Sequence, residues 1–174
     1  FKCGQIPDSH PVKVLLVCSK TQEQEFIARG LPEKVETLHY GKVTGSNRYS
    51  MVPCIVVAGR IEMPVAVAER LAAMLSAKEL RPSLPNYQKQ NVLVKGESVS
   101  AYYHPDSLVE SLRRSMNESQ LLQAIGRGRA VRRTHENPLD VLILTSVPLN
   151  LEPELLTLTD WKNVQATTLE MILS

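Results

Sequence analysis

Long hydrophobic runs are missing from this sequence. Its longest apolar stretches, such as the Val-Leu-Leu-Val-Cys run at residues 14–18, are the length of a strand. A membrane-spanning helix needs about 20 apolar residues in a row, and the chain does not open on the basic-then-apolar segment of a secretory signal. We therefore expect no membrane partner. Because the chain opens on Phe1 rather than Met, we interpret it as part of a longer protein.

Cysteine and histidine are sparse and scattered. The 3 cysteines have no metal-ligand spacing and the 4 histidines form no cluster, so the sequence supports neither a zinc site nor a histidine-based catalytic triad. Cys18 and Cys54 lie within apolar runs, where a reduced, buried thiol is expected. Reduced cysteines are typical of cytosolic proteins, so we predict a cytoplasmic location.

A phosphate-binding P-loop is also missing. In the nearest approximation, Gly41-Lys42, Val43 stands where the loop needs a serine or threonine for magnesium, and Glu36 stands where its first glycine should be. The sequence also lacks the paired carboxylates that metal-dependent nucleases and phosphatases use. We therefore expect no ATP hydrolysis by this chain alone.

The residues that are present predict a globular α/β protein. Hydrophobic residues make up 43% and charged residues 22% of the 174 residues, which suits one domain with a substantial core. Segments with the pattern of buried strands alternate with helical segments, and this order predicts a mainly parallel sheet flanked by helices. The expected strands are residues 12–19, 35–40, 54–58 and 141–144, and the first two expected helices are residues 21–31 and 65–78.

Residues 82–103 differ in character and predict an inserted β-hairpin. Two strand-like runs, at residues 91–95 and 98–103, meet at a Lys-Gly-Glu turn. We expect this hairpin to be an appendage between the units of the sheet.

The stretch after the hairpin predicts two helical segments. The first is expected to begin at Pro105 and Asp106. Asn117 followed by Gln120 resembles a capping pair that would start the second. Its residues expected in the core are Leu121, Leu122 and Ile125.

Positive charge is concentrated at the end of this stretch. Residues 113–133 contain six arginines and the single acid Glu118, a local net charge of +5, so the rest of the chain carries −3 of the total of +2. A basic focus on a mildly acidic body indicates a localised site for a polyanion. On a helix Gln123, Gly126 and Arg127 would share one face. A solvated basic turn is the alternative interpretation of the same charge.

The order of these residues resembles motif VI of superfamily 2 helicases, which reads Gln-x-x-Gly-Arg-x-x-Arg. The matching residues are Gln123, Gly126 and Arg127. Ala130 stands at the last arginine of the motif, and Arg129 and Arg132 are the candidates to replace it. Two glycines within three residues cost a helix about 1 kcal/mol each relative to alanine. We therefore expect a break near Gly128 that turns Arg129 back beside Arg127.

A second segment resembles motif V of the same helicases, in which a Gly-x-Asp or Gly-x-Asn loop precedes a strand. Gly45 and Asn47 occupy these two positions, although Gly-Ser-Asn is also ordinary turn chemistry. The resemblance covers roughly residues 12–145. More narrowly, the two segments together with Ala58-Gly59-Arg60 and His104-Pro105-Asp106 resemble helicase-type proteins of bacterial plasmids and prophages.

The resemblance implies that this chain is the second RecA-like lobe of an ATP-dependent helicase or translocase. Residues 12–147 would form the lobe, with residues 82–103 as a hairpin insertion. Residues 1–11 would be a leader or linker, and residues 148–174 a truncated C-terminal extension. The implied cofactor is ATP, whose magnesium the absent first lobe would bind. The other implied partners are that lobe and nucleic acid, expected to be DNA.

The resemblance also assigns roles to single residues. Arg127 and Arg129 would act as catalytic residues at the γ-phosphate, in that order of preference and ahead of Arg132. The residues implied to line the nucleotide are Gln123, Gly126, Gly45 and Asn47, and those implied to contact nucleic acid are Arg132, Arg133 and Arg48. The competing hypothesis is a non-catalytic DNA-binding or scaffold domain of a mobile-element replication protein, which would use the basic patch only for phosphate contacts.

Overall fold

The computed structural model describes residues 11–42, 48–76, 85–94 and 97–145. The strands are β1 (Val14–Cys18), β2 (Val35–His39), β3 (Cys54–Ala58), β4 (Gln88–Val94), β5 (Glu97–Tyr103) and β6 (Asp140–Leu144). The α-helices are α1 (Lys20–Arg29), α2 (Val65–Ser76) and α3 (Ser107–Ile125), and the short 3-10 helices are η1 (Tyr40–Lys42), η2 (Gly126–Gly128) and η3 (Ala130–Arg132). Residues 1–10 of the predicted leader (1–11), the residues Gly45 and Asn47 and the predicted extension at 148–174 lie outside the described residues.

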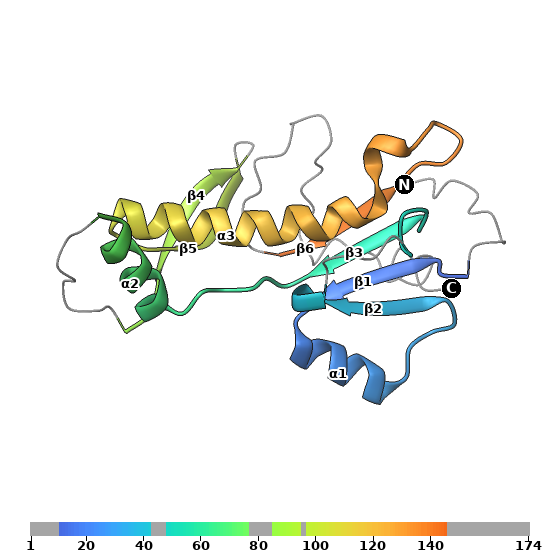
Figure 1. The fold of residues 1–174 in the computed structure, drawn as a ribbon, viewed down its shortest axis with the longest axis horizontal. Coiled ribbons are helices and arrows are strands. Elements are labelled where there is room, and N and C mark those ends of the chain that lie inside the picture. Colours follow the sequence, from blue (N-terminus) through green and yellow to red (C-terminus); the bar gives the residue numbers. More distant parts are fainter. Residues whose placement is uncertain (1–10, 43–47, 77–84, 95–96, 146–174) are drawn as a thin grey trace.

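Four strands form a parallel sheet in the order β2-β1-β3-β6 (Figure 1). Strand β1 lies at its centre, where Val14 pairs with Val35 on one side and with Cys54 on the other. Strands β4 and β5 form a separate antiparallel hairpin. The predicted α/β class, with a mainly parallel sheet, flanking helices and a β-hairpin, is confirmed.

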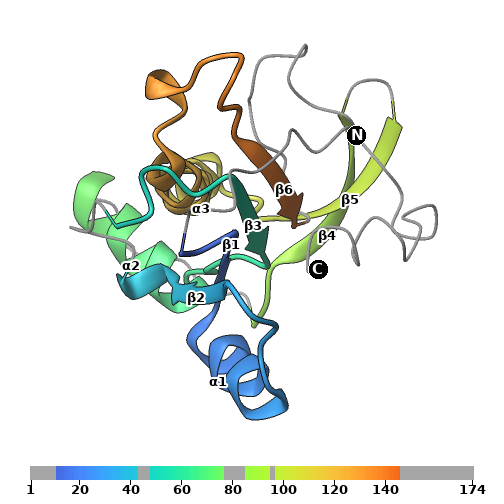
Figure 2. The same cartoon turned by 90° about the vertical axis from the view of Figure 1, so that its right-hand side faces the viewer.

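One face of the sheet packs against the C-terminal half of α3. Alternate residues of β1 and β3 point to this face, as expected for strands, and Leu15, Val17, Ile55 and Val57 are each 0% exposed. Leu121 and Ala124 of α3 join this cluster, and the helix is seen end-on against the sheet in Figure 2. The opposite face carries a second cluster around Val14, Val35, Cys54 and Val56.

Helix α3 is continuous, so the prediction of a new helical segment at Asn117 is wrong. The helix is capped by Asp106, whose carboxylate accepts hydrogen bonds from the main-chain nitrogens of Leu108 and Val109, and it runs unbroken from there to Ile125. Asparagine caps a helix only where its backbone is extended, whereas Asn117 lies inside the helix and is buried. The prediction that Leu122 is in the core is also wrong, because its side chain is 47% exposed.

The N-terminal half of α3 packs against α2 in a smaller cluster of Met63, Ala68, Ala72 and Val109. In Figure 1 the hairpin lies beside this same half of the helix. Within the described part of the chain, no helix is long and apolar enough to cross a membrane.

Candidate functional site: the arginine segment

The helix break expected near Gly128 is present. After α3 ends at Ile125 the chain forms the 3-10 turn η2, and Arg129 then takes a left-handed conformation with φ 50° and ψ 51°. A second 3-10 turn, η3, follows and ends at Arg132, and the backbone of the next residue, Arg133, is extended. We call residues 126–133 the arginine segment.

Gly128 fixes how closely this segment approaches the sheet. A Cβ atom on Gly128 would lie 2.4 Å from Cδ2 of Leu139 and 2.9 Å from Cδ1 of Ile55, distances at which carbon atoms overlap. Gly126 is exposed, and an added Cβ would meet nothing within 4 Å. The two glycines therefore differ in use, since only Gly128 is required for packing.

Arg133 fastens the segment to the loop that precedes β3. Its guanidinium donates to the main-chain oxygens of Gly128 at 2.8 Å, Val52 at 2.7 Å and Ser50 at 3.2 Å, and to Oδ1 of Asn137 at 3.1 Å. Burial lowers the pKa of Arg133, but an arginine remains charged at neutral pH. We predicted a nucleic-acid contact for Arg133, and the structure instead shows its hydrogen bonds directed into the fold.

The remaining predicted residues of the segment lie nearer the surface. Gln123 and Gly126 are exposed, in the last turn of α3 and at the start of η2. Arg127 and Arg129 are half-buried, whereas Arg132 is exposed. The segment thus contains two half-buried arginines and one exposed arginine besides Arg133.

Arg48 lies in the loop before β3, the same loop that Arg133 contacts at Ser50 and Val52. Arg48 forms an ion pair with Glu36 of β2, and its guanidinium lies 5.8 Å from the centre of the Tyr49 ring. Tyr49 is buried and its hydroxyl donates to Oε2 of Glu36 at 3.0 Å. Burial, followed by this hydrogen bond, raises the pKa of Tyr49. Arg133 bonds to Ser50 and Val52, which directly follow the described end of the predicted motif V, so the arginine segment contacts the chain next to that motif.

At the opposite end of the sheet, where the strands have their carboxyl ends, side chains of the protein contact the end of β3. Open parallel sheets commonly bind ligands there, between the strands where the order reverses. At that point Gln22 lies 3.3 Å from where a Cβ of Gly59 would be, and the hydroxyl of Tyr40 donates to the carbonyls of Ala58 and Gly59, each at 3.1 Å. No group of three potential metal ligands occurs among the described residues. The arginine segment is therefore the stronger candidate site.

Comparisons of this chain with protein-family models, with curated proteins and with solved structures found no match. The resemblance to superfamily 2 helicases therefore depends on the residues of the two segments and remains a prediction.

Proposed function

We propose that this chain is the second RecA-like lobe of a nucleic-acid-dependent ATPase and that the arginine segment serves a nucleotide held by another lobe. The observation that supports this proposal best is the set of Arg133 contacts. They fasten the motif VI-like segment to the loop that contains the motif V-like residues, although Arg133 and Ser50 are 83 positions apart. In the helicases that the chain resembles, motif VI faces the nucleotide and motif V lies between nucleotide and nucleic acid, so the proposal requires the two segments to lie near each other.

The conformation of the segment suits a preorganised anion site. Arg127 lies in the short turn η2, in which Gly128 packs against Leu139 and Ile55. This packing holds the backbone of Arg127 in place before any ligand binds. Arg129 has a positive φ of 50°, a conformation that costs a residue other than glycine about 1 kcal/mol or more and that is frequent at functional sites. On this proposal ATP and its magnesium come with the first lobe, and Arg127 neutralises charge that develops on the γ-phosphate.

The test measures DNA-stimulated ATP turnover in the natural-length protein that carries this chain. Arg127→Ala should lower the turnover number by about 10³-fold, the typical effect of losing an arginine that stabilises the transition state, and should leave DNA affinity nearly unchanged. Arg29→Ala is the matched control, because Arg29 is an exposed arginine on α1 whose nearest acidic atom is 3.9 Å away. Turnover that is equal in the two variants would exclude the proposal.

A DNA-binding module without a motor is the second candidate, and the local net charge of +5 over residues 113–133 favours it. In that case Arg127→Ala and Arg132→Ala should each weaken DNA binding modestly. Each should also lower the slope of log affinity against log salt by about one. The natural-length protein should then show no ATP turnover for Arg127 to affect.

A further inference from the structure

Asn117 of α3 is buried without a hydrogen-bond partner. The residue is 2% exposed, and neither its amide nitrogen nor its carbonyl oxygen has a partner among the residues that the structure describes. Both atoms are also sealed from water. Buried polar groups in proteins are nearly always hydrogen-bonded, because a donor or acceptor without a partner costs its full desolvation free energy. The conformation that the structure shows is therefore destabilised at Asn117.

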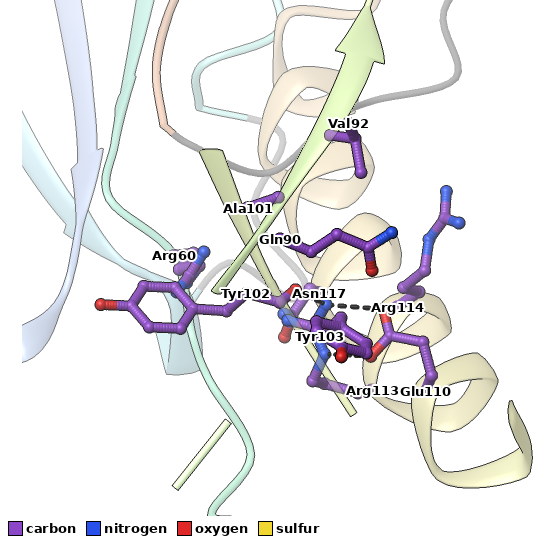
Figure 3. Close-up of a pocket in the computed structure, with 10 residues that line it drawn as sticks. All are labelled: Arg60, Gln90, Val92, Ala101, Tyr102, Tyr103, Glu110, Arg113, Arg114 and Asn117. Carbon is purple, nitrogen blue, oxygen red and sulfur yellow. Dashed lines mark hydrogen bonds and ion pairs between the residues drawn. The ribbon is translucent and has the colours of Figure 1, made fainter. Parts of the chain in front are cut away.

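The β-hairpin packs over this part of α3 with a gap. A cavity of about 230 Å³ lies between the two, and Asn117 is among the residues that line it (Figure 3). Gln90 and Ala101, which pair across the hairpin, line the other wall. Empty space beside a side chain forfeits the dispersion contacts that close packing would give. The hairpin is therefore packed loosely on the helix.

Few contacts hold the strands of the hairpin on α3. Among the residues of β4 and β5 whose burial the structure describes, Ala101 alone is buried. Arg113 of α3 donates to the carbonyl of Tyr102 on β5. A sheet of two strands is only marginally stable by itself in water, and a segment with few buried apolar contacts opens at a lower free energy than the core. The hairpin can therefore leave the helix while the four-stranded sheet stays folded.

The base of the hairpin is held more firmly than its strands. Tyr87, which precedes β4, donates to the carbonyl of Met63 at 2.7 Å, and its ring meets the ring of His104 edge-on with centres 6.3 Å apart. His104, which follows β5, bonds to Glu69 of α2 at 3.2 Å. Its main-chain nitrogen donates to Glu110 of α3 at 2.8 Å. Both ends of the hairpin are therefore fixed to α2 and α3, and the strands extend from this base.

We propose that the β-hairpin is a flap that swings on its base at Tyr87 and His104, and that the unpartnered Asn117 favours its opening. In the closed position, which the structure shows, Ala101 is buried and Asn117 lacks partners. Opening hydrates both polar groups of Asn117, and this gain offsets the loss of the contacts of Ala101 and Arg113. The flap thereby controls access to the face of α3 that carries Arg113 and Asn117.

Labelling of a thiol under the hairpin tests whether the flap opens. In the full chain, Ala101→Cys places a thiol on the buried side of β5 beside the cavity, where a polyethylene-glycol maleimide is too large to enter unless the hairpin moves. Cys18 and Cys54 are buried in the sheet, so their labelling, measured for each cysteine by mass spectrometry, reports unfolding of the sheet. The Ala101→Cys thiol should react about tenfold faster or more. Equal rates would overturn the proposal, since the hairpin would then open only with the sheet.

A second variant tests the role of Asn117. Asn117→Leu should slow labelling of the Ala101→Cys thiol about tenfold or more, because it removes the unpartnered amide and an open flap would expose an apolar side chain. Asn91→Leu is the matched control, since Asn91 is exposed and lies on the other face of β4 from Gln90. It should leave the rate unchanged.

The variants also keep this proposal separate from the proposed function. If Asn117→Leu does not fold, Asn117→Ala removes the same two polar groups without adding volume and should also slow labelling. Unchanged or faster labelling in the Asn117 variant would overturn its role in opening. Arg127→Ala should leave all the labelling rates unchanged, so the result does not depend on whether the arginine segment serves ATP turnover.

Discussion

Gly128 and Gly126 have the same side chain but different surroundings, and this difference gives a paired prediction. Gly128→Ala should lower the free energy of unfolding by about 1–3 kcal/mol, the usual cost of forcing an extra carbon into a packed core, because its Cβ would overlap Leu139 and Ile55. Gly126→Ala should be neutral or stabilise by up to about 1 kcal/mol, because Gly126 has φ −58° and open space around it. Urea denaturation of both variants measures the difference. Equal destabilisation would show that the contact with the core is not the cause.

At the scale of single residues the sequence predicted the position of the arginine segment correctly. It did not predict the contacts that each residue of the segment makes. The clustered arginines and glycines identified residues 123–133. The role of Gly128 depends on Leu139 and Ile55, and that of Arg133 depends on the carbonyls of Ser50 and Val52, 83 and 81 positions away. Such long-range contacts leave no mark in the local sequence. For the same reason the sequence did not reveal Asn117 as a buried amide.

At the scale of elements, α3 joins two clusters of the core. Leu121 and Ala124 belong to the cluster on the sheet, and Val109 belongs to the cluster with α2. The hairpin is held to this helix by Arg113, because Arg113 bonds both to the carbonyl of Tyr102 on β5 and to Glu110 on its own helix. Burial acts to lower the pKa of Arg113, but the hydrogen bonds and the charges of Glu110 and Glu62 outweigh it and raise the pKa overall. The guanidinium is therefore charged at any ordinary pH.

Replacing Arg113 should loosen the hairpin. Arg113→Met should lower the free energy of unfolding by about 2–3 kcal/mol. This is below the roughly 3–5 kcal/mol for breaking a wholly buried pair, because the partners Glu62 and Glu110 are 26% and 20% exposed. Amide hydrogen exchange should accelerate in β4 and β5 more than in β1 and β3. Arg114→Met is the control, and as a half-exposed neighbour it should change stability by less than about 1 kcal/mol. Uniform acceleration across all strands would contradict this role.

Element types were predictable because they follow from local patterns. Short apolar runs predicted β1, β3 and β6, a short mixed segment predicted β2, and the change of pattern after residue 82 predicted the hairpin. The continuity of α3 was not predicted, because an Asn-x-x-Gln capping pattern and a mid-helix Asn-x-x-Gln have the same letters. No glycine or proline interrupts residues 107–125, and the burial of Asn117 against the hairpin follows from tertiary packing.

At the scale of the whole molecule the strand order was left open by the sequence. Strands β3 and β6 are neighbours, although α2, the hairpin and α3 all lie between them in the chain. That connection returns the chain to the sheet edge where the arginine segment meets the loop before β3. The arginine segment therefore lies at the end of the connection between β3 and β6, directly after α3.

Stability of the whole molecule should fall in alkali, partly through one buried thiol. Burial, followed by the charge of Glu23, raises the pKa of Cys18 from its ordinary 9.0 to about 11. Because the folded pKa is the higher one, the unfolded chain loses this proton first as pH rises. The stabilisation by the neutral thiol is full below about pH 9 and is lost as pH rises through about 11.

Urea denaturation between pH 8 and pH 11 tests this expectation. A single group changes the free energy of unfolding by up to about 1.4 kcal/mol per pH unit, so the parent should lose about 2–3 kcal/mol more over this range than Cys18→Ala. Burial, followed by the charge of Cys18, raises the pKa of Tyr40, so Cys18→Ala also removes the smaller part of the Tyr40 contribution. Val17→Ala is the matched control, since Val17 is a neighbouring buried residue that does not titrate. It should lower stability at every pH without changing the slope, and equal slopes for the parent and Cys18→Ala would exclude the thiol as the source.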